Sequence, residues 1–151
     1  MDMAVKPQGC TNLKLRQLMR RVAAHYDAEV GQAGLKGTQY SLLSYVAKLG
    51  PIRPADLAAE MRISPSTLTR NVKPLVDAGL VEVLPGADAR SRLVSVTALG
   101  REKRQEAQRR WRVAQEGINE MLGPRRVVQL HALLDECLER LAERAADGED
   151  A

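Results

Sequence analysis

A run of hydroxyl and cationic side chains between residues 64 and 79 is the strongest candidate for chemistry in this sequence. Leu68, Val72, Leu75 and Val76 recur at helical spacing and predict one apolar stripe on a helix. The opposite face carries donors with no carboxylate among them, namely Ser66, Thr67, Thr69, Arg70 and Lys73. Such donors can bind phosphate oxygens and base edges together. We therefore expect this helix to read DNA.

The residues at the start of this helix and near its end predict its shape. Ser64 can cap the N-terminus, and Pro65 suits the first helical position, where no backbone donor is needed. Pro74 removes one backbone hydrogen bond and clashes with the preceding turn, which costs ~3 kcal/mol in a straight helix. We expect a kink near Arg70–Pro74, or a helix whose regular part ends early. Either outcome shifts the expected DNA contacts towards Ser66–Arg70.

The neighbouring segments predict the elements that position this helix. Ala55–Met61 forms a short helix, and Arg62–Ile63 connects it tightly to Ser64, which is the helix-turn-helix pattern. Leu80–Leu84 and Leu93–Val96 predict a hairpin directly behind it, which makes a wing. Pro51–Arg53 is too short for more than a strand at the sheet edge.

Length and composition exclude several classes of protein. The chain has 151 residues, 44% of them hydrophobic and 28% charged, which suits one globular domain. No apolar run approaches the roughly 20 residues that a bilayer span needs, and no signal-peptide pattern opens the chain, so we expect a cytoplasmic protein without a membrane partner. Two distant cysteines and the lack of a catalytic motif predict no metal, no cofactor and no enzyme activity. The aromatic content of 3% argues against a stacking platform for single-stranded nucleic acid.

The positive charge is concentrated in the middle of the chain. Residues 53–110 hold 11 Lys/Arg against 7 Asp/Glu, whereas residues 111–151 hold 5 against 9. The expected reading helix lies in the basic part, and we expect the acidic end to face away from any phosphate.

Amphipathic helices flank the middle of the chain. Thr11 and Thr38 are expected to cap the first two helices, which end at Val30 and Leu49, and Thr97 to cap one that runs to about Leu122. Gly123–Pro124 starts a last helix, on which Cys137 shares the apolar side and is expected to lie in the core. Three of these helices carry more apolar surface than one small winged lobe can cover, namely Thr11–Val30, Thr97–Leu122 and Pro124–Leu141. A monomeric bundle or a dimer would explain this excess.

The order of elements, together with four short motifs, resembles the MarR family of winged-helix transcription regulators. The motifs are Ser66–Arg70, Gly79–Val81, Asp88–Arg92 and Val96–Arg101, and the resemblance covers about Thr11 to Leu141. It implies a mostly α fold with a small β-wing, in a single domain over residues 1–151. Residues 38–96 would form the DNA-binding lobe, and residues 11–31 and 97–143 the dimerisation helices.

The resemblance also implies roles for individual residues in DNA binding. The helix from Ser64 would lie in the major groove, with Arg70 as the candidate for a guanine contact and Lys73 on phosphate. Ser64, Ser66, Thr67 and Thr69 would reach phosphate or base edges, unless they serve helix-start chemistry alone.

The wing would bind DNA independently of the helix. Arg90 matches the family's minor-groove arginine, and Asp88 would hold that arginine by a charge-assisted hydrogen bond rather than contact DNA. Arg92 would bind the DNA backbone. The alternative is a solvated turn with one surface ion pair.

Two features could control DNA binding in a member of this family. Cys10 lies at the start of the first helix, where the dipole and Lys14 could lower the thiol pKa, and some members sense organic hydroperoxides near this point. An unreactive thiol is the alternative.

Other members bind small aromatic or phenolic ligands. Such a pocket would be lined by Tyr26, Tyr40, Tyr45 and Trp111, with Arg16 or Arg20 pairing an anion, unless these aromatics are ordinary packing residues.

The expected function is therefore a homodimeric, sequence-specific transcriptional regulator that binds a pseudo-palindromic DNA duplex, and a repressor that a small ligand releases. The alternatives are a repressor that senses oxidants through Cys10 and an architectural DNA binder of low sequence specificity.

Overall fold

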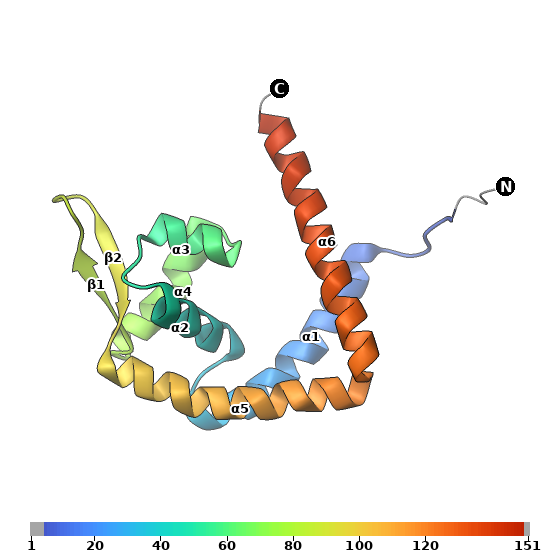
Figure 1. The fold of residues 1–151 in the computed structure, drawn as a ribbon, viewed down its shortest axis with the longest axis horizontal. Helices are drawn as coiled ribbons and strands as arrows, with labels where there is room; N and C mark the ends of the chain where they lie inside the picture. The colour runs from blue at the N-terminus through green and yellow to red at the C-terminus, as the bar shows by residue number, and fades with distance from the viewer. Residues whose placement is uncertain (1–4, 150–151) are drawn as a thin grey trace. The chain divides into compact units, whose positions relative to one another are not determined.

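The computed structural model describes residues 5–149, with side chains for 5–144, and this part of the chain is mostly helical with one antiparallel hairpin. The elements in chain order are α1 (Thr11–Val30), the 3-10 turn η1 (Gly31–Ala33), α2 (Gly37–Leu49), α3 (Pro54–Met61), α4 (Pro65–Asp77), β1 (Val81–Pro85), β2 (Arg92–Val96), α5 (Ala98–Leu122) and α6 (Pro124–Glu149) (Figure 1). The expected fold class is confirmed. The chain divides into two compact units, Met1–Ala114 and Gln115–Ala151.

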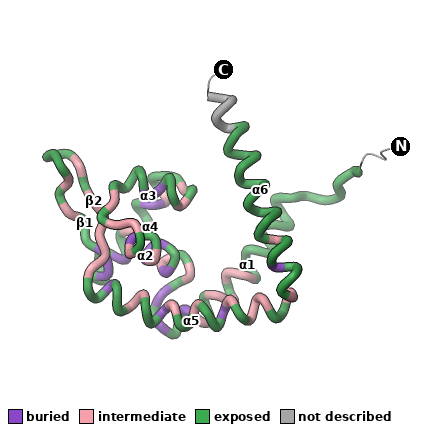
Figure 2. Tube along the Cα trace, viewed as in Figure 1, coloured by how far each residue is buried: buried purple, intermediate pink, exposed green. Residues whose placement is uncertain are grey.

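The core of the first unit lies where α2, α3, α4 and the hairpin meet (Figure 2). Its largest fully buried side chains are Val30, Leu42, Leu43, Val46, Leu57, Leu68, Leu75, Val81 and Val94. Burial of a leucine or valine side chain contributes about 1.5–3 kcal/mol. Leu68 and Leu75 belong to the apolar stripe predicted for the reading helix, so this stripe attaches α4 to the core.

Helix α4 begins as predicted but does not end early. Ser64 caps it, because its Oγ accepts a hydrogen bond from the Thr67 amide at 3.2 Å, and Pro65 takes the first helical position. The helix continues through Pro74 to Asp77, so the early end that we considered is wrong. Leu75, one residue after the proline, is buried in the core and holds the last turn in place. Gly79 then reverses the chain at a φ of 73°.

The hairpin β1–β2 pairs Val81 with Val96 at its base and Pro85 with Arg92 at its tip. The segment before α3 adds one isolated bridge, in which Ile52 exchanges backbone hydrogen bonds of 3.1 and 2.8 Å with Val94. This confirms that Pro51–Arg53 reaches the sheet edge only. The wing base is therefore joined to the helix-turn-helix by backbone hydrogen bonds.

The junction between the hairpin and α5 is closely packed. Thr97 caps α5 as predicted, since its Oγ1 accepts from the Gly100 amide at 3.0 Å and donates to the Gly79 carbonyl at 2.6 Å. The Leu80 carbonyl also accepts from the Thr97 amide at 3.1 Å and lies directly against the Gly100 backbone.

The caps of the first two helices differ from the prediction by one or two residues. Cys10, and not Thr11, caps α1, since its Sγ accepts from the Leu13 amide at 3.5 Å. Helix α2 begins at Gly37, so Thr38 lies inside it, and the Gln39 side chain returns to the Lys36 amide at 2.9 Å. The Gly37 amide donates to the Asp27 carboxylate on α1 at 2.7 Å. A contact distant in sequence therefore decides where α2 starts.

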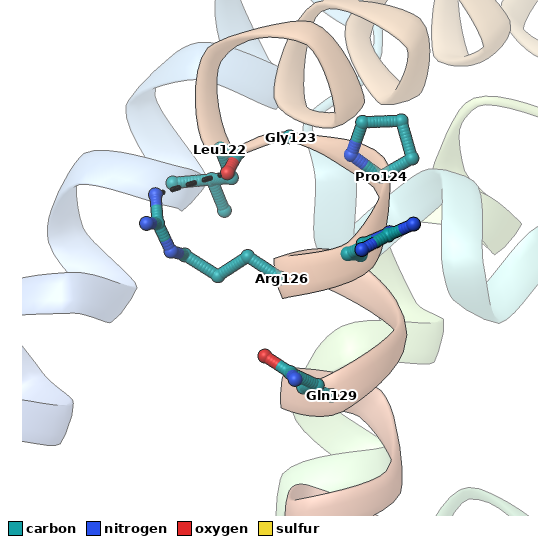
Figure 3. Close-up of a pocket in the computed structure, with 6 residues that line it drawn as sticks. Leu122, Gly123, Pro124, Arg126 and Gln129 are labelled. Atoms are coloured by element: carbon teal, nitrogen blue, oxygen red, sulfur yellow. Dashed lines mark hydrogen bonds between the residues drawn. The ribbon is translucent and has the colours of Figure 1, made fainter.

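The second unit contains the end of α5 and helix α6. Gly123 has a φ of 87°, and Pro124 opens α6 as predicted. The Arg126 guanidinium donates to the Leu122 carbonyl at 3.0 Å across this break (Figure 3). Leu133, Leu138 and Cys137 are all exposed, so the expectation that Cys137 lies in a core is wrong for the single chain.

Within residues 5–149, none of the helices combines the length and the apolar composition that crossing a bilayer requires.

Candidate nucleic-acid interface

The outer face of α4 presents the predicted hydroxyl groups, which are already linked to one another. The Ser64 Oγ lies 2.8 Å from the Thr67 Oγ1 and 3.2 Å from the Ser66 Oγ. The Thr69 hydroxyl donates to the Pro65 carbonyl at 3.0 Å, and the Arg70 guanidinium lies 3.5 Å from the Thr67 Oγ1. Ser64, Ser66, Thr69 and Arg70 are exposed, and Thr67 is half-buried. The Ser64 hydroxyl thus serves to cap the helix, while the Arg70 side chain reaches back towards Thr67 in the preceding turn.

Lys73 lies one turn further along and forms an ion pair with Asp77, with 2.9 Å between Nζ and Oδ2. Both side chains are largely exposed, so this pair contributes about 0–1 kcal/mol. A phosphate could replace the carboxylate at little cost.

The tip of the wing is organised by the Asp88 carboxylate. Its Oδ1 accepts from the Arg90 amide at 2.9 Å, the Ser91 amide at 2.9 Å and the Ser91 hydroxyl at 2.8 Å. Asp88 therefore holds Arg90 by a charge-assisted hydrogen bond, and the donor is the Arg90 backbone amide. A carboxylate two residues ahead reaches backbone amides more easily than a long flexible side chain. The exposed Arg90 side chain extends from a fixed backbone.

Ser91 is a wing residue that the sequence reasoning missed. Its carbonyl accepts from the Gly86 amide at 2.9 Å, which closes the loop, and a Cβ at Gly86 would lie 2.5 Å from the Ser91 Cβ. Asp followed three residues later by Ser is a turn pattern that could have indicated this role.

These hydrogen bonds hold the pKa of the Asp88 carboxyl below its ordinary value. The Ser91 hydroxyl is the largest cause, followed by the backbone amides of Arg90 and Ser91. A lowered pKa means that the folded turn favours the charged form. The resulting stabilisation is complete above the ordinary carboxyl pKa and is lost as the pH falls through the folded-state value.

We expect the wing turn to remain formed at a pH where an ordinary aspartate is half protonated. In an NMR titration of the folded protein, the Arg90 and Ser91 amide shifts should change with a midpoint below about 3.9. Asp88→Asn keeps the acceptor oxygen but cannot titrate, so its shifts should stay constant over that range. A midpoint at or above 3.9 in the wild type would contradict this account.

A groove between α4 and the wing brings several predicted DNA-binding residues together. It has a volume of about 390 Å³. Its lining combines apolar and polar side chains, namely Pro54, Leu68, Thr69, Val72, Lys73, Val76, Val83, Arg92 and Val94. Thr69 and Lys73 from the helix thus open into the same groove as Arg92 from the wing.

The predicted ligand-pocket residues separate in the structure. Tyr26 and Trp111 line a cavity of about 380 Å³ in the first unit. Tyr40 is buried and stacks on Trp111, with 6.2 Å between ring centroids. Three further predicted residues do not line this cavity, and they are Tyr45, Arg16 and Arg20. Arg20 lies in a separate depression on α1.

The Cys10 thiol is exposed, but its expected cationic neighbour is directed elsewhere. The Lys14 ammonium donates to the Gln8 carbonyl at 3.5 Å. Among the residues with described side chains, no group of three His, Cys, Asp or Glu residues could hold a metal ion.

Helices α3 and α4 with the hairpin behind them define a winged helix-turn-helix DNA-binding protein. A family model described as the MarR family matches residues 33–91. The M. tuberculosis transcriptional regulator MosR, solved in complex with DNA, is 32% identical over 88% of this chain and 98% of its own, with a TM-score of 0.75. The chain belongs to the MarR family of winged-helix transcriptional regulators and is a DNA-binding transcriptional regulator, not an enzyme.

Two further relatives agree with this assignment. A probable transcriptional regulator from Pseudomonas aeruginosa is 26% identical over 85% of this chain and 96% of its own, with a TM-score of 0.76. An uncharacterized HTH-type transcriptional regulator of Bacillus subtilis, YwoH, is 27% identical over 93 residues, which are 62% of this chain and 68% of its own.

Proposed function

We propose that this chain acts in the cytoplasm as a homodimeric repressor that binds a pseudo-palindromic operator and is released by a small ligand. Residues 38–96 bind the DNA, and residues 11–31 and 97–143 form the dimer. The observation that carries the proposal is the groove that Thr69, Lys73 and Arg92 share.

The groove and the face beside it have the chemistry of a duplex-binding surface. Lys73 and Arg92 supply positive charge for a DNA backbone strand that passes between helix and wing. Arg70 on the exposed side of α4 contacts a base edge in the major groove, with Ser66, Thr67 and Thr69 around it. Arg90 at the ordered tip of the wing enters the minor groove. The MosR structure, which contains DNA, supports a duplex as the partner.

Uncovered apolar side chains support the homodimer. Leu13, Leu15, Leu18 and Met19 are exposed on α1. Five apolar side chains on α6 are exposed as well, namely Val128, Leu133, Leu134, Leu138 and Leu141. Clusters of exposed apolar side chains mark interaction surfaces, and two-fold pairing of identical surfaces is the commonest way to bury them.

The cavity with Tyr26 and Trp111 supports control by a ligand. A volume of about 380 Å³ lies in the range of small-molecule sites. Its lining includes Asn71 of α4, so a bound molecule contacts the helix that reads DNA. A ligand that fits only one placement of α4 shifts the protein towards it.

The proposal is tested by selecting bound duplexes from a random pool with the purified protein. We expect enrichment of a two-fold symmetric site whose affinity falls steeply with salt, since phosphate contacts release counterions. Sedimentation should give a species of twice 16.6 kDa. Equal binding to random duplex would favour the architectural alternative, and a 16.6 kDa species would overturn the dimer. If peroxide releases the protein from DNA and Cys10→Ser abolishes this release, the signal that controls DNA binding is an oxidant and not a ligand.

A further inference from the structure

The cavity beside Trp111 contains a carboxylate and no cationic side chain. Its lining comes from α1, α2, α3, α4, α5 and the turn before α4, namely Met19, Val22, Ala23, Tyr26, Asp27, Gly37, Thr38, Ser41, Met61, Ile63, Asn71 and Trp111. Asp27 is the only charged residue among these described side chains. The cations expected from the sequence, Arg16 and Arg20, are not part of this lining.

The Asp27 carboxylate is held in place at the cavity. Its Oδ1 accepts from the Gly37 amide at 2.7 Å, where α2 begins. Gly37 leaves space for this contact, since a Cβ there would lie 3.2 Å from the same oxygen. Asp27 is also exposed to solvent. The cavity thus carries a fixed negative charge.

Aromatic and apolar side chains form the rest of the wall. Tyr26 and Trp111 supply aromatic rings to the lining, and the negative quadrupole of an aromatic ring attracts cations. Burial raises the pKa of the Tyr26 phenol, so this side chain remains neutral near pH 7. Met19, Val22 and Ile63 provide apolar surface for a carbon skeleton, while Thr38, Ser41 and Asn71 offer hydrogen bonds.

We propose that this cavity takes an organic cation, such as an arylalkyl amine or quaternary ammonium compound, in preference to a carboxylate or phenolate. The inference rests on the proposed control by a small ligand and specifies the charge of that ligand. An ammonium group pairs with Asp27 while its aromatic part lies against Tyr26 and Trp111. An anion in the same position meets Asp27 with no cationic side chain from this lining to pair with it.

Trp111 is the only tryptophan of the chain, so its fluorescence reports on the cavity directly. We would titrate the DNA-free protein with 2-phenylethylamine and with 3-phenylpropionate, a matched pair of opposite charge, at constant ionic strength. The expected result is saturable binding of the amine, at least about tenfold tighter than that of the carboxylate. Equal affinities, tighter binding of the carboxylate, or binding of neither probe would overturn the inference.

Asp27→Asn removes the negative charge but keeps the hydrogen bond that orders this position, because the amide oxygen can still accept from the Gly37 amide. We expect this variant to lose about tenfold in amine affinity and to keep the circular dichroism spectrum and melting temperature of the wild type. Glu29→Gln is the matched control, since Glu29 lies on the same helix, pairs with Gln32 and does not line the cavity. If both variants bind the amine as the wild type does, Asp27 does not select the ligand and the inference fails.

A DNA-release assay distinguishes this inference from the proposed function. Amine binding that leaves the DNA complex intact would refute control through this cavity and still support its cation preference. Release of DNA by the carboxylate but not by the amine would support ligand control and overturn the cation preference.

Discussion

Gly100→Ala should lower the free energy of unfolding by about 3 kcal/mol, which is the upper part of the range for overpacking. A Cβ at Gly100 would overlap the Leu80 carbonyl oxygen and lie 2.9 Å from the Val96 Cγ2. The carbonyl cannot rotate away easily, because it accepts a hydrogen bond from the Thr97 amide at 3.1 Å. Either α5 moves away from the hairpin or this hydrogen bond breaks.

Thermal unfolding followed by circular dichroism measures this effect. A loss of 3 kcal/mol corresponds to a fall of about 10 °C in the melting temperature of a chain of this length. Gly31→Ala is the matched control, since Gly31 has a helical φ of −59° and a Cβ there would meet no atom within 4 Å. We expect the control to be neutral or slightly stabilising. Similar melting temperatures for the two variants would refute the packing argument.

Arg70→Ala should weaken binding to the selected operator by about 10- to 100-fold and relax the preference at one base pair. A bidentate arginine contact to guanine contributes about 1–3 kcal/mol of discrimination against the wrong base. Arg70 is exposed on α4, and its guanidinium has one long hydrogen bond of 3.5 Å to the Thr67 hydroxyl. Little intramolecular stabilisation is therefore lost when it binds a base.

Lys73→Ala is the comparison variant that distinguishes the loss of a base contact from the loss of positive charge. Lys73 is exposed on the same helix and is proposed to bind phosphate, so its loss should weaken all duplexes about equally and reduce the salt dependence. Fluorescence anisotropy with the operator and its single base-pair variants distinguishes the two patterns. If Arg70→Ala weakens every duplex to the same extent, Arg70 is a phosphate contact and does not read sequence.

Local patterns were sufficient to predict the helix-turn-helix and the wing. Ser64 and Pro65 start α4, and Thr97 caps α5, because these signals act within one helical turn. The start of α2 was misplaced because Asp27, ten residues earlier, binds the Gly37 amide. The early end considered for α4 at Pro74 was also wrong, since burial of Leu75 depends on residues distant in sequence.

The sequence by itself determined the type and order of the elements, the basic reading face and the family. Hydrophobic periodicity, caps and turn residues are local properties, and they persist in any tertiary arrangement. Only the tertiary structure decided that Thr69, Lys73 and Arg92 share a groove, and that Asp27 lines the cavity beside Trp111. Spacing along the chain predicts which side of a helix a residue occupies. Which partner that side meets is decided by the packing of segments far apart in the sequence.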